Sequence, residues 1–242
     1  MESTRTQSTL GLVAACFKSR LLSYVCQGIV GIALAMTSIV SYAGATSDDD
    51  FSYSNQAVKW WKWALETPVK LSVASPALAS HPGFDEGPVD CSIGQSGNVW
   101  YLAGKIFFGG TVRRSCSVPS QTALFFPLYN SVYINFATDP TLTRKFCRAI
   151  TDGSLEGFGD VKMKVWVDGT KVKDADEHFE ESKIFSVQMP APSTNISTNL
   201  MAYFKYTETE FPNWVAGANC DFGWYSVVPS LSLGTHTIAW IV

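Results

Sequence analysis

Four cysteines beyond residue 45 constrain the fold of this chain more than any other feature of its sequence. They are Cys91, Cys116, Cys147 and Cys220. In an oxidising compartment such cysteines predict two disulfides, and no C-x-x-C spacing supports zinc instead. Four cysteines allow three pairings. We favour Cys91–Cys116, because each abuts a strand-like run with a Gly109-Gly110 turn between them, and Cys147–Cys220 then follows by elimination.

The N-terminus predicts that this compartment is reached by export. Residues 1–20 are polar and carry three cations against one glutamate, and an apolar stretch follows them. Ala43 and Ala45 form a small-residue cleavage site, so we predict a secretory signal over residues 1–45 that is cleaved after Ala45. An uncleaved anchor over residues 21–45 is the alternative. The chain is therefore expected in the periplasm or the extracellular space, touching a membrane only through this segment if it is retained.

The charge of the remaining chain limits its partners. Beyond residue 45 there are 15 Lys and Arg against 20 Asp and Glu, a net charge of −5, and no long basic run. A nucleic-acid partner is therefore not expected. The 197 residues that follow the signal suffice for one domain with a sizeable core. We predict a flexible lead-in over residues 46–54 and a single domain over residues 55–242.

Short apolar and aromatic runs separated by turn signals indicate strands along most of this domain. The clearest lies over residues 160–174, where apolar and polar residues alternate before an Asp168-Gly169 turn. Other strands are predicted on both sides of Gly109-Gly110, in "TALFFPLYNSVYINF" with breaks at Pro127 and Asn130, and in "FSVQMP", "NLMAYFKYTE" and "THTIAWIV".

Two helices interrupt these strands. The first runs from Asn55, its expected cap, to Pro68 and holds three tryptophans in four residues, so that Trp60 or Trp63 must line a second contact. The second is capped by Asp139 and ends at Asp152-Gly153. The expected fold is mainly β: an antiparallel β-sandwich, of which a jelly roll is one form, with an N-terminal Trp-rich helix and one short inserted helix.

Three segments resemble a family of exported bacterial proteins. They are "VDCSIGQSGNVWYLAG", "GGTVRRSCSVP" and "ALFFPLYN", which fit the pattern C-x3-Q-x3-V-W-[FY]-L-A-G, R-x-C-x-V-P and L-F-F-P-[IL]-x-N. The resemblance covers residues 55–135, with a weaker echo in "LGTHTI". It implies export and supplies no catalytic residue. The closing strand of that family continues past H-T-I, so we expect this chain, which stops at Val242, to have a truncated or altered C-terminus.

Catalytic signatures are missing from the sequence. G-x-S-x-G, phosphate-binding and dinucleotide-binding glycine motifs and H-E-x-x-H are all absent. The three histidines are His81, His178 and His236, no two of them close in sequence, and His236 is interpreted as a strand residue rather than a base. Carboxylates in Asp85-Glu86 and in residues 174–181 could serve a hydrolase or calcium, although a solvated loop is the simpler interpretation. No cofactor or metal is expected.

Aromatic residues suggest the function. All eight tryptophans lie beyond residue 45, and exposed rings on a β-sandwich commonly stack on sugars. The candidate ligand-binding residues are Gln95, Trp100, Arg114, Asn130, Trp60 and Trp63. We therefore expect a non-catalytic binding or accessory module whose partner is a glycan or an envelope protein. The alternatives are a carboxylate-dependent hydrolase of a polysaccharide or other envelope polymer, and a structural protein that pairs through an edge strand.

Overall fold

The computed structural model describes residues 51–71, 80–83, 87–88, 90–104, 111–156, 162–193 and 196–242. The predicted signal segment, its cleavage site after Ala45, the Asp85-Glu86 pair and the Gly109-Gly110 turn lie outside these residues. The helices are α1 (Tyr53–Glu66), α2 (Arg144–Leu155), α3 (Leu200–Tyr203) and a 3₁₀ turn (Pro212–Trp214). The strands are β1 (Val69–Lys70), β2 (Gly87–Pro88), β3 (Val99–Tyr101), β4 (Arg114–Ser115), β5 (Ala123–Tyr133), β6 (Lys164–Val167), β7 (Thr170–Lys171), β8 (Phe179–Glu181), β9 (Phe185–Gln188), β10 (Ser197–Thr198), β11 (Val215–Val228) and β12 (Ile238–Ile241).

Strands β5 and β11 form the centre of the largest sheet. They are antiparallel, with a register that runs from Cys220 opposite Tyr133 to Val228 opposite Leu124. On one side β3 pairs with β5 in parallel, and on the other side β8 and β9 both pair antiparallel with β11. The structure confirms a mainly β fold with few helices. Its sheets are mixed rather than wholly antiparallel.

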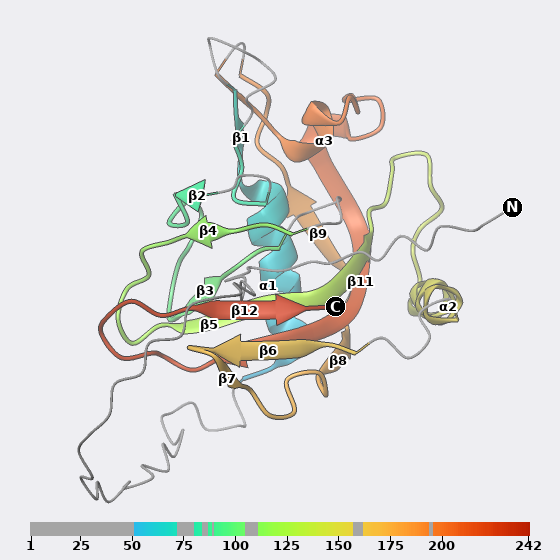
Figure 1. Ribbon diagram of the computed structural model, residues 1–242. Coiled ribbons are helices and arrows are strands. Elements are labelled where there is room, and N and C mark those ends of the chain that lie inside the picture. The colour runs from blue at the N-terminus through green and yellow to red at the C-terminus, as the bar shows by residue number, and fades with distance from the viewer. Residues whose placement is uncertain are drawn as a thin grey trace, which may run out of the picture.

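The two faces of this sheet carry two separate hydrophobic clusters, because successive side chains of β5 point in opposite directions. Phe125 faces α1 and packs in one cluster with its tryptophans and with Tyr225. Phe126 points the other way and stacks on Trp240 of β12, with ring centroids 4.5 Å apart. Strand β12 belongs to a second sheet of order β12-β6-β7. In Figure 1 the cyan helix α1 therefore lies behind β5 and β11, and β6 and β12 lie in front.

Helix α1 begins two residues earlier than predicted. The Ser52 side chain accepts the backbone N–H of Asn55, so Ser52 rather than Asn55 caps the helix. All three tryptophans of the helix are buried. The expected second contact is real, because the sheet covers one side of α1 and residues 91–104 cover another.

The inserted helix α2 also differs from the prediction at both ends. Its cap is Thr143, whose side chain accepts the N–H of Phe146, and the helix continues through Gly153 to Leu155. Asp139 instead accepts the N–H of Phe136 at 3.0 Å and caps a turn before the helix.

The segment "NLMAYFKYTE" was predicted as a strand, and this is wrong. Asn199 accepts the N–H of Ala202 at 2.7 Å and starts α3. Local capping thus overrides the apolar pattern, because the side chain of Asn199 supplies a helical partner that a strand would not offer.

Several other strand predictions are confirmed, although β3 and β4, on the two sides of Gly109-Gly110, pair with β5 and β2 and do not form a hairpin with each other. The Asp168-Gly169 turn connects β6 and β7, with φ of 50° and 78° at its two residues, as a tight hairpin turn requires. Strands β9 and β12 are also confirmed. Strand β5 is continuous across the predicted breaks, since Pro127 lies at a register shift opposite Tyr225 where a missing N–H is tolerated.

The structure forms both predicted disulfides. Cys91 is bonded to Cys116 and Cys147 to Cys220, with Cα atoms 5.6 and 6.2 Å apart. Two disulfides fit an oxidising, non-cytoplasmic environment. Within the described ranges, none of the helices has the length and apolar character needed to cross a bilayer.

We predict that Gly223→Ala destabilises the protein by about 1–3 kcal/mol, the usual cost of overpacking a filled site. A Cβ at Gly223 would lie 2.5 Å from the carbonyl oxygen of Tyr129 and 2.7 Å from the Cα of Asn130, both of which are backbone atoms of β5. Chemical denaturation measures the loss.

Gly217→Ala on the same strand is the matched control. Its Cβ would meet only the hydroxyl of Ser186, at 4.0 Å, so its unfolding free energy should stay close to that of the wild type. Equal effects of the two variants would contradict the close approach of β11 to β5 at Gly223.

Candidate functional site

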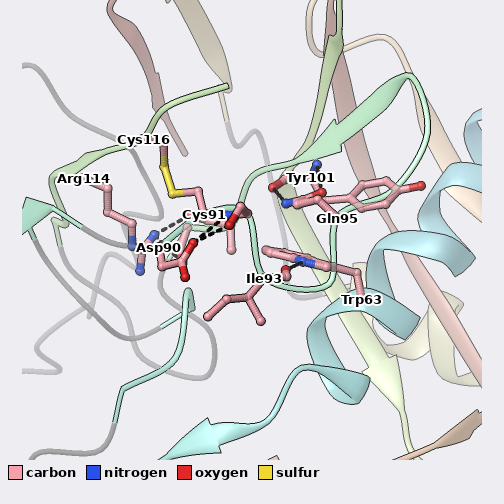
Figure 2. The surroundings of a disulfide bond; sticks show 11 residues. Trp63, Asp90, Cys91, Ile93, Gln95, Tyr101, Arg114 and Cys116 are labelled. Carbon is pink, nitrogen blue, oxygen red and sulfur yellow. Dashed lines mark hydrogen bonds between the residues drawn. A yellow bond between two sulfur atoms is a disulfide. The ribbon is translucent and has the colours of Figure 1, made fainter. Parts of the chain in front are cut away.

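Residues 91–104, which contain the candidates Gln95 and Trp100, are part of the architecture. Figure 2 shows Cys91 bonded to Cys116 at one end of this stretch and Gln95 reaching toward Tyr101 at the other. The amide of Gln95 donates to the carbonyl of Tyr101 at 2.8 Å and accepts its N–H at 2.9 Å. Leu102 bonds to Phe125 on the other side. Gln95 thus replaces a neighbouring strand along the outer edge of β3.

The same stretch satisfies the polar atoms of α1. The Trp60 indole donates to the carbonyl of Leu102 at 2.8 Å, and the Trp63 indole donates to the carbonyl of Ile93 at 2.9 Å. In Figure 2 the Trp63 ring lies between Ile93 and Tyr101. Because their rings are buried and their N–H groups are bonded, Trp60 and Trp63 present no stacking surface in this structure.

The remaining candidate residues do not meet in one concave surface. Trp100 is buried in the cluster facing the second sheet. Asn130 lies near the other face of the central sheet, where its amide donates to the hydroxyl of Tyr225 at 3.4 Å. Arg114 donates from one guanidinium nitrogen to the carbonyls of Ala103 and Gly104. Of the candidates in the described ranges, Arg114 alone lines the cavity of about 550 Å³ that is described below.

We predict that Gln95→Ala lowers the free energy of unfolding by about 1–3 kcal/mol, because it leaves the N–H and C=O of the buried Tyr101 without their partner. Urea denaturation measures this, with the exposed Ser96→Ala as the control. A wild-type midpoint for Gln95→Ala would show that Gln95 has no structural role.

A cavity of about 550 Å³, named here the main groove, lies between residues 113–124 and residues 231–238. Its lining is mixed. Apolar residues include Leu102, Val118, Leu231 and Leu233, while Arg113, Arg114 and His236 carry or can carry positive charge. Six hydroxyl side chains complete it: Ser115, Ser120, Thr122, Ser232, Thr235 and Thr237.

One wall of the main groove carries Ser232 and His236, and His236 also contacts Asp168, which is not among the residues that line the groove. The pairing of β12 with β6 sets Val167 opposite Ile238, which brings Asp168 of the hairpin turn beside His236. Asp168 Oδ2 lies 2.7 Å from His236 Nδ1. His236 Nε2 lies 3.2 Å from Ser232 Oγ and 3.0 Å from the carbonyl oxygen of Ser232. The pattern of the sequence did not reveal this group, because 68 residues separate Asp168 from His236.

The charges of this group stabilise each other. The hydrogen bond to His236 and the N–H of Thr237 lower the pKa of Asp168. The hydrogen bond to Asp168, followed by that to the carbonyl of Ser232, raises the pKa of His236 above 6.5. The interpretation of His236 as a strand residue is wrong, because His236 lies just before β12 and bonds to Asp168 of the hairpin turn and to Ser232.

A second unusual group is the carboxyl of Asp221, which is buried on the α1 side of β11. The hydroxyl of Tyr225 lies 2.9 Å from its Oδ1 and also contacts Oδ2. Burial raises the pKa of Asp221 to about 8. The hydrogen bond from Tyr225 and the nearby Trp61 indole oppose this rise, whereas the charge of Glu180 adds to it. The Trp61 N–H itself makes no hydrogen bond of standard geometry. Burial also raises the pKa of Glu180.

Asp221 borders a smaller cavity of about 280 Å³ beside the Cys147–Cys220 disulfide. The cavity is also lined by Arg144, Arg148 and Lys183. Arg148 is paired with Glu181 at 3.4 Å. No group of three or more potential metal ligands occurs among the residues that the structure describes.

We predict that the stability of the wild type falls as pH rises from about 4 to about 8. The carboxyl of Asp221 has a pKa of about 8 when folded and an ordinary value of 3.8 when unfolded, so unfolding releases a proton across this window. The stabilising contribution is complete below the unfolded pKa and is lost as pH passes the folded one. Asp221→Asn should reduce this fall, and the raised pKa values of Glu180 and His236 account for the part that remains.

Denaturation curves between pH 4 and pH 9 measure the effect. The exposed Asp176→Asn is the control and should keep the wild-type pH dependence. An unchanged pH dependence in Asp221→Asn would contradict a neutral buried carboxyl.

Comparisons with known proteins find no match for this chain: no family model, no curated protein and no solved structure matches it. The function must therefore be argued from the residues themselves.

Proposed function

We propose that the protein is an exported binding protein that holds an amphipathic ligand, with an anionic group and an apolar part, in the main groove. The groove carries this proposal. Its volume of about 550 Å³ is in the range of small-molecule sites. Arg113 and Arg114 supply positive charge in a chain that is otherwise acidic, and Leu231 and Leu233 supply apolar surface.

The lining also argues against a neutral sugar bound by ring stacking. Among the described residues that line the main groove there is no phenylalanine, tyrosine or tryptophan. Trp60, Trp61 and Trp63 belong to one buried cluster, and Trp100 and Trp240 belong to the other. A glycan ligand would need acidic groups for Arg113 and hydroxyl groups for the serines and threonines.

The compartment fits this proposal. Two disulfides support a periplasmic or extracellular setting, where small ligands of the envelope are met.

We also propose that the central sheet and the β12-β6-β7 sheet form a sandwich-like pair, which Phe126 and Trp240 support by stacking between them. This pairing holds the hairpin turn of Asp168 next to the groove.

The test is a fluorescence titration with 8-anilinonaphthalene-1-sulfonate, a probe that is anionic and apolar. We expect saturable binding, and Arg113→Gln should weaken it about tenfold or more, because a hydrogen bond to a charged group contributes roughly 1.5–3 kcal/mol. Lys59→Gln, an exposed cation of α1, is the matched control and should bind as the wild type does.

Competition then defines the ligand class. Displacement of the probe by acidic oligosaccharides or by acyl carboxylates, and not by neutral oligosaccharides, is the expected result. No saturable binding by the wild type, unchanged affinity in Arg113→Gln, or displacement by neutral oligosaccharides would contradict the proposal.

A carboxylate-dependent hydrolase is the second candidate. The observation that favours it is Asp221, a buried carboxyl with a pKa of about 8 at the border of a cavity. It ranks second because Glu180, whose charge acts on Asp221, is not among the residues that line that cavity. Hydrolysis of an envelope polysaccharide that Asp221→Asn abolishes would support it.

A further inference from the structure

The wall of the main groove that carries Ser232 and His236 can do more than bind. Ser232 is exposed, lines the groove, and places its hydroxyl 3.2 Å from His236 Nε2. The opposite ring nitrogen faces the carboxylate of Asp168 at 2.7 Å. A hydroxyl, an imidazole and a carboxylate in this order form a nucleophile, a base and a group that orients the base.

We propose that Ser232, His236 and Asp168 form a nucleophilic triad that hydrolyses an ester of the ligand held in the main groove. This inference rests on the proposed function, because the groove must first bind the ester. The sequence carries no local signature for such a triad.

Asp168 is held firmly enough to orient the imidazole. Its Oδ1 accepts the N–H of Thr237 at 2.7 Å while Oδ2 accepts from His236. Its own N–H donates to the carbonyl of Thr237 at 2.8 Å. Both carboxylate oxygens are therefore occupied, and the Nδ1–H tautomer of His236 is favoured, which leaves the Nε2 lone pair for Ser232.

Protonation decides which of two bonds Nε2 makes. When the ring is charged, Nε2–H donates to the carbonyl of Ser232, 3.0 Å away. When the ring is neutral, Nε2 can accept the hydroxyl proton of Ser232 at 3.2 Å. The site is thus inactive below the raised pKa of His236 and active above it.

The groove surrounds this histidine with few other charges. The charged residues lining it, besides His236, are Arg113 and Arg114 from the other wall. Asp168 favours protonation of the ring and desolvation opposes it. The two arginines attract an anionic ester.

The reaction needs only water as a co-reactant. The Ser232 hydroxyl gives its proton to His236 Nε2, the Oγ–C bond to the ester carbonyl forms, and the bond from carbon to the leaving oxygen breaks as that oxygen takes the proton. Water then attacks the acyl carbon, passes a proton to Nε2, and the Oγ–C bond breaks as Ser232 recovers the proton. The acid is released and no electrons are transferred.

The loop after Ser232 also supplies donors. No hydrogen bond among the described residues uses the N–H of Leu233 or of Gly234. These are the backbone donors that follow the nucleophile directly, and such groups stabilise the charge on an acyl oxygen. Gly234 has a φ of 141°, a conformation open to glycine and costly for other residues, so the shape of this loop depends on it.

The experiment labels the full chain with a fluorophosphonate and measures hydrolysis of p-nitrophenyl butyrate between pH 5 and pH 9. We expect the label on Ser232 in peptide mapping and a rate that rises with pH through the pKa of His236. Ser232→Ala should abolish labelling and hydrolysis, and Asp168→Asn should lower the rate by at least about 100-fold, in the range that general bases contribute. The exposed Ser230→Ala is the matched control.

NMR titration of His236 provides a readout independent of turnover. Its pKa should lie above 6.5 in the wild type and move down in Asp168→Asn, and the midpoint of the rate profile should match it. A rate profile whose midpoint does not match this pKa would overturn the triad.

Binding of 8-anilinonaphthalene-1-sulfonate separates the two proposals. If the wild type binds this probe but shows no labelling or hydrolysis above Ser232→Ala, the triad is overturned and the binding function stands. If the wild type neither binds nor reacts, both are overturned. Labelling of another serine, or equal activity in Ser232→Ala, would also overturn the triad.

Discussion

The pairing of β5 with β11 is the interaction on which the rest of the structure depends. Both hydrophobic clusters lie against β5, one through Phe125 and one through Phe126. Strand β11 extends this support, since β8 and β9 share its outer edge and the Cys147–Cys220 disulfide connects it to α2. The contact requires glycine at position 223, where the backbone of β5 comes too close for a Cβ.

The cost of this arrangement is a core that contains polar groups. Asn219 in β11 is fully buried, and it accepts the N–H of Asn135 and donates to the carbonyl of Ala216, both at 3.0 Å. Asp221 follows two residues later and bonds to Tyr225. These side chains satisfy backbone and hydroxyl groups where β11 changes partners, so burial shifts the pKa of Asp221 without leaving the carboxyl alone.

Most of the tryptophans are buried in the two hydrophobic clusters. The polar and charged side chains of the main groove come largely from loops. The tryptophans of α1 bond to the carbonyls of residues 91–104, while Gln95 pairs with Tyr101 as a strand would. Residues 91–104, which contain the candidates Gln95 and Trp100, are therefore architectural. The groove and its Ser232–His236–Asp168 group lie instead where two loops meet the hairpin turn of the second sheet.

Local signals allowed several elements to be predicted. The β6–β7 hairpin follows from alternation and Asp168-Gly169, and α1 follows from its apolar spacing. The sequence pattern did not predict β11, the longest of the described strands, because several of its buried positions are Asn219, Asp221 and Gly223 rather than apolar residues. It also placed a strand where Asn199 starts α3. In each case a tertiary partner or a capping bond outweighed the pattern.

By itself, the sequence determined a mainly β chain with two disulfides, an N-terminal tryptophan helix and no recognisable catalytic motif. These properties depend on composition and on neighbours within a few residues, which a pattern records. Only the tertiary structure decided that Asp168 meets His236 and that Asp221 is buried beside Tyr225. Those contacts depend on strand register and on burial, and both are set by residues far apart in the chain.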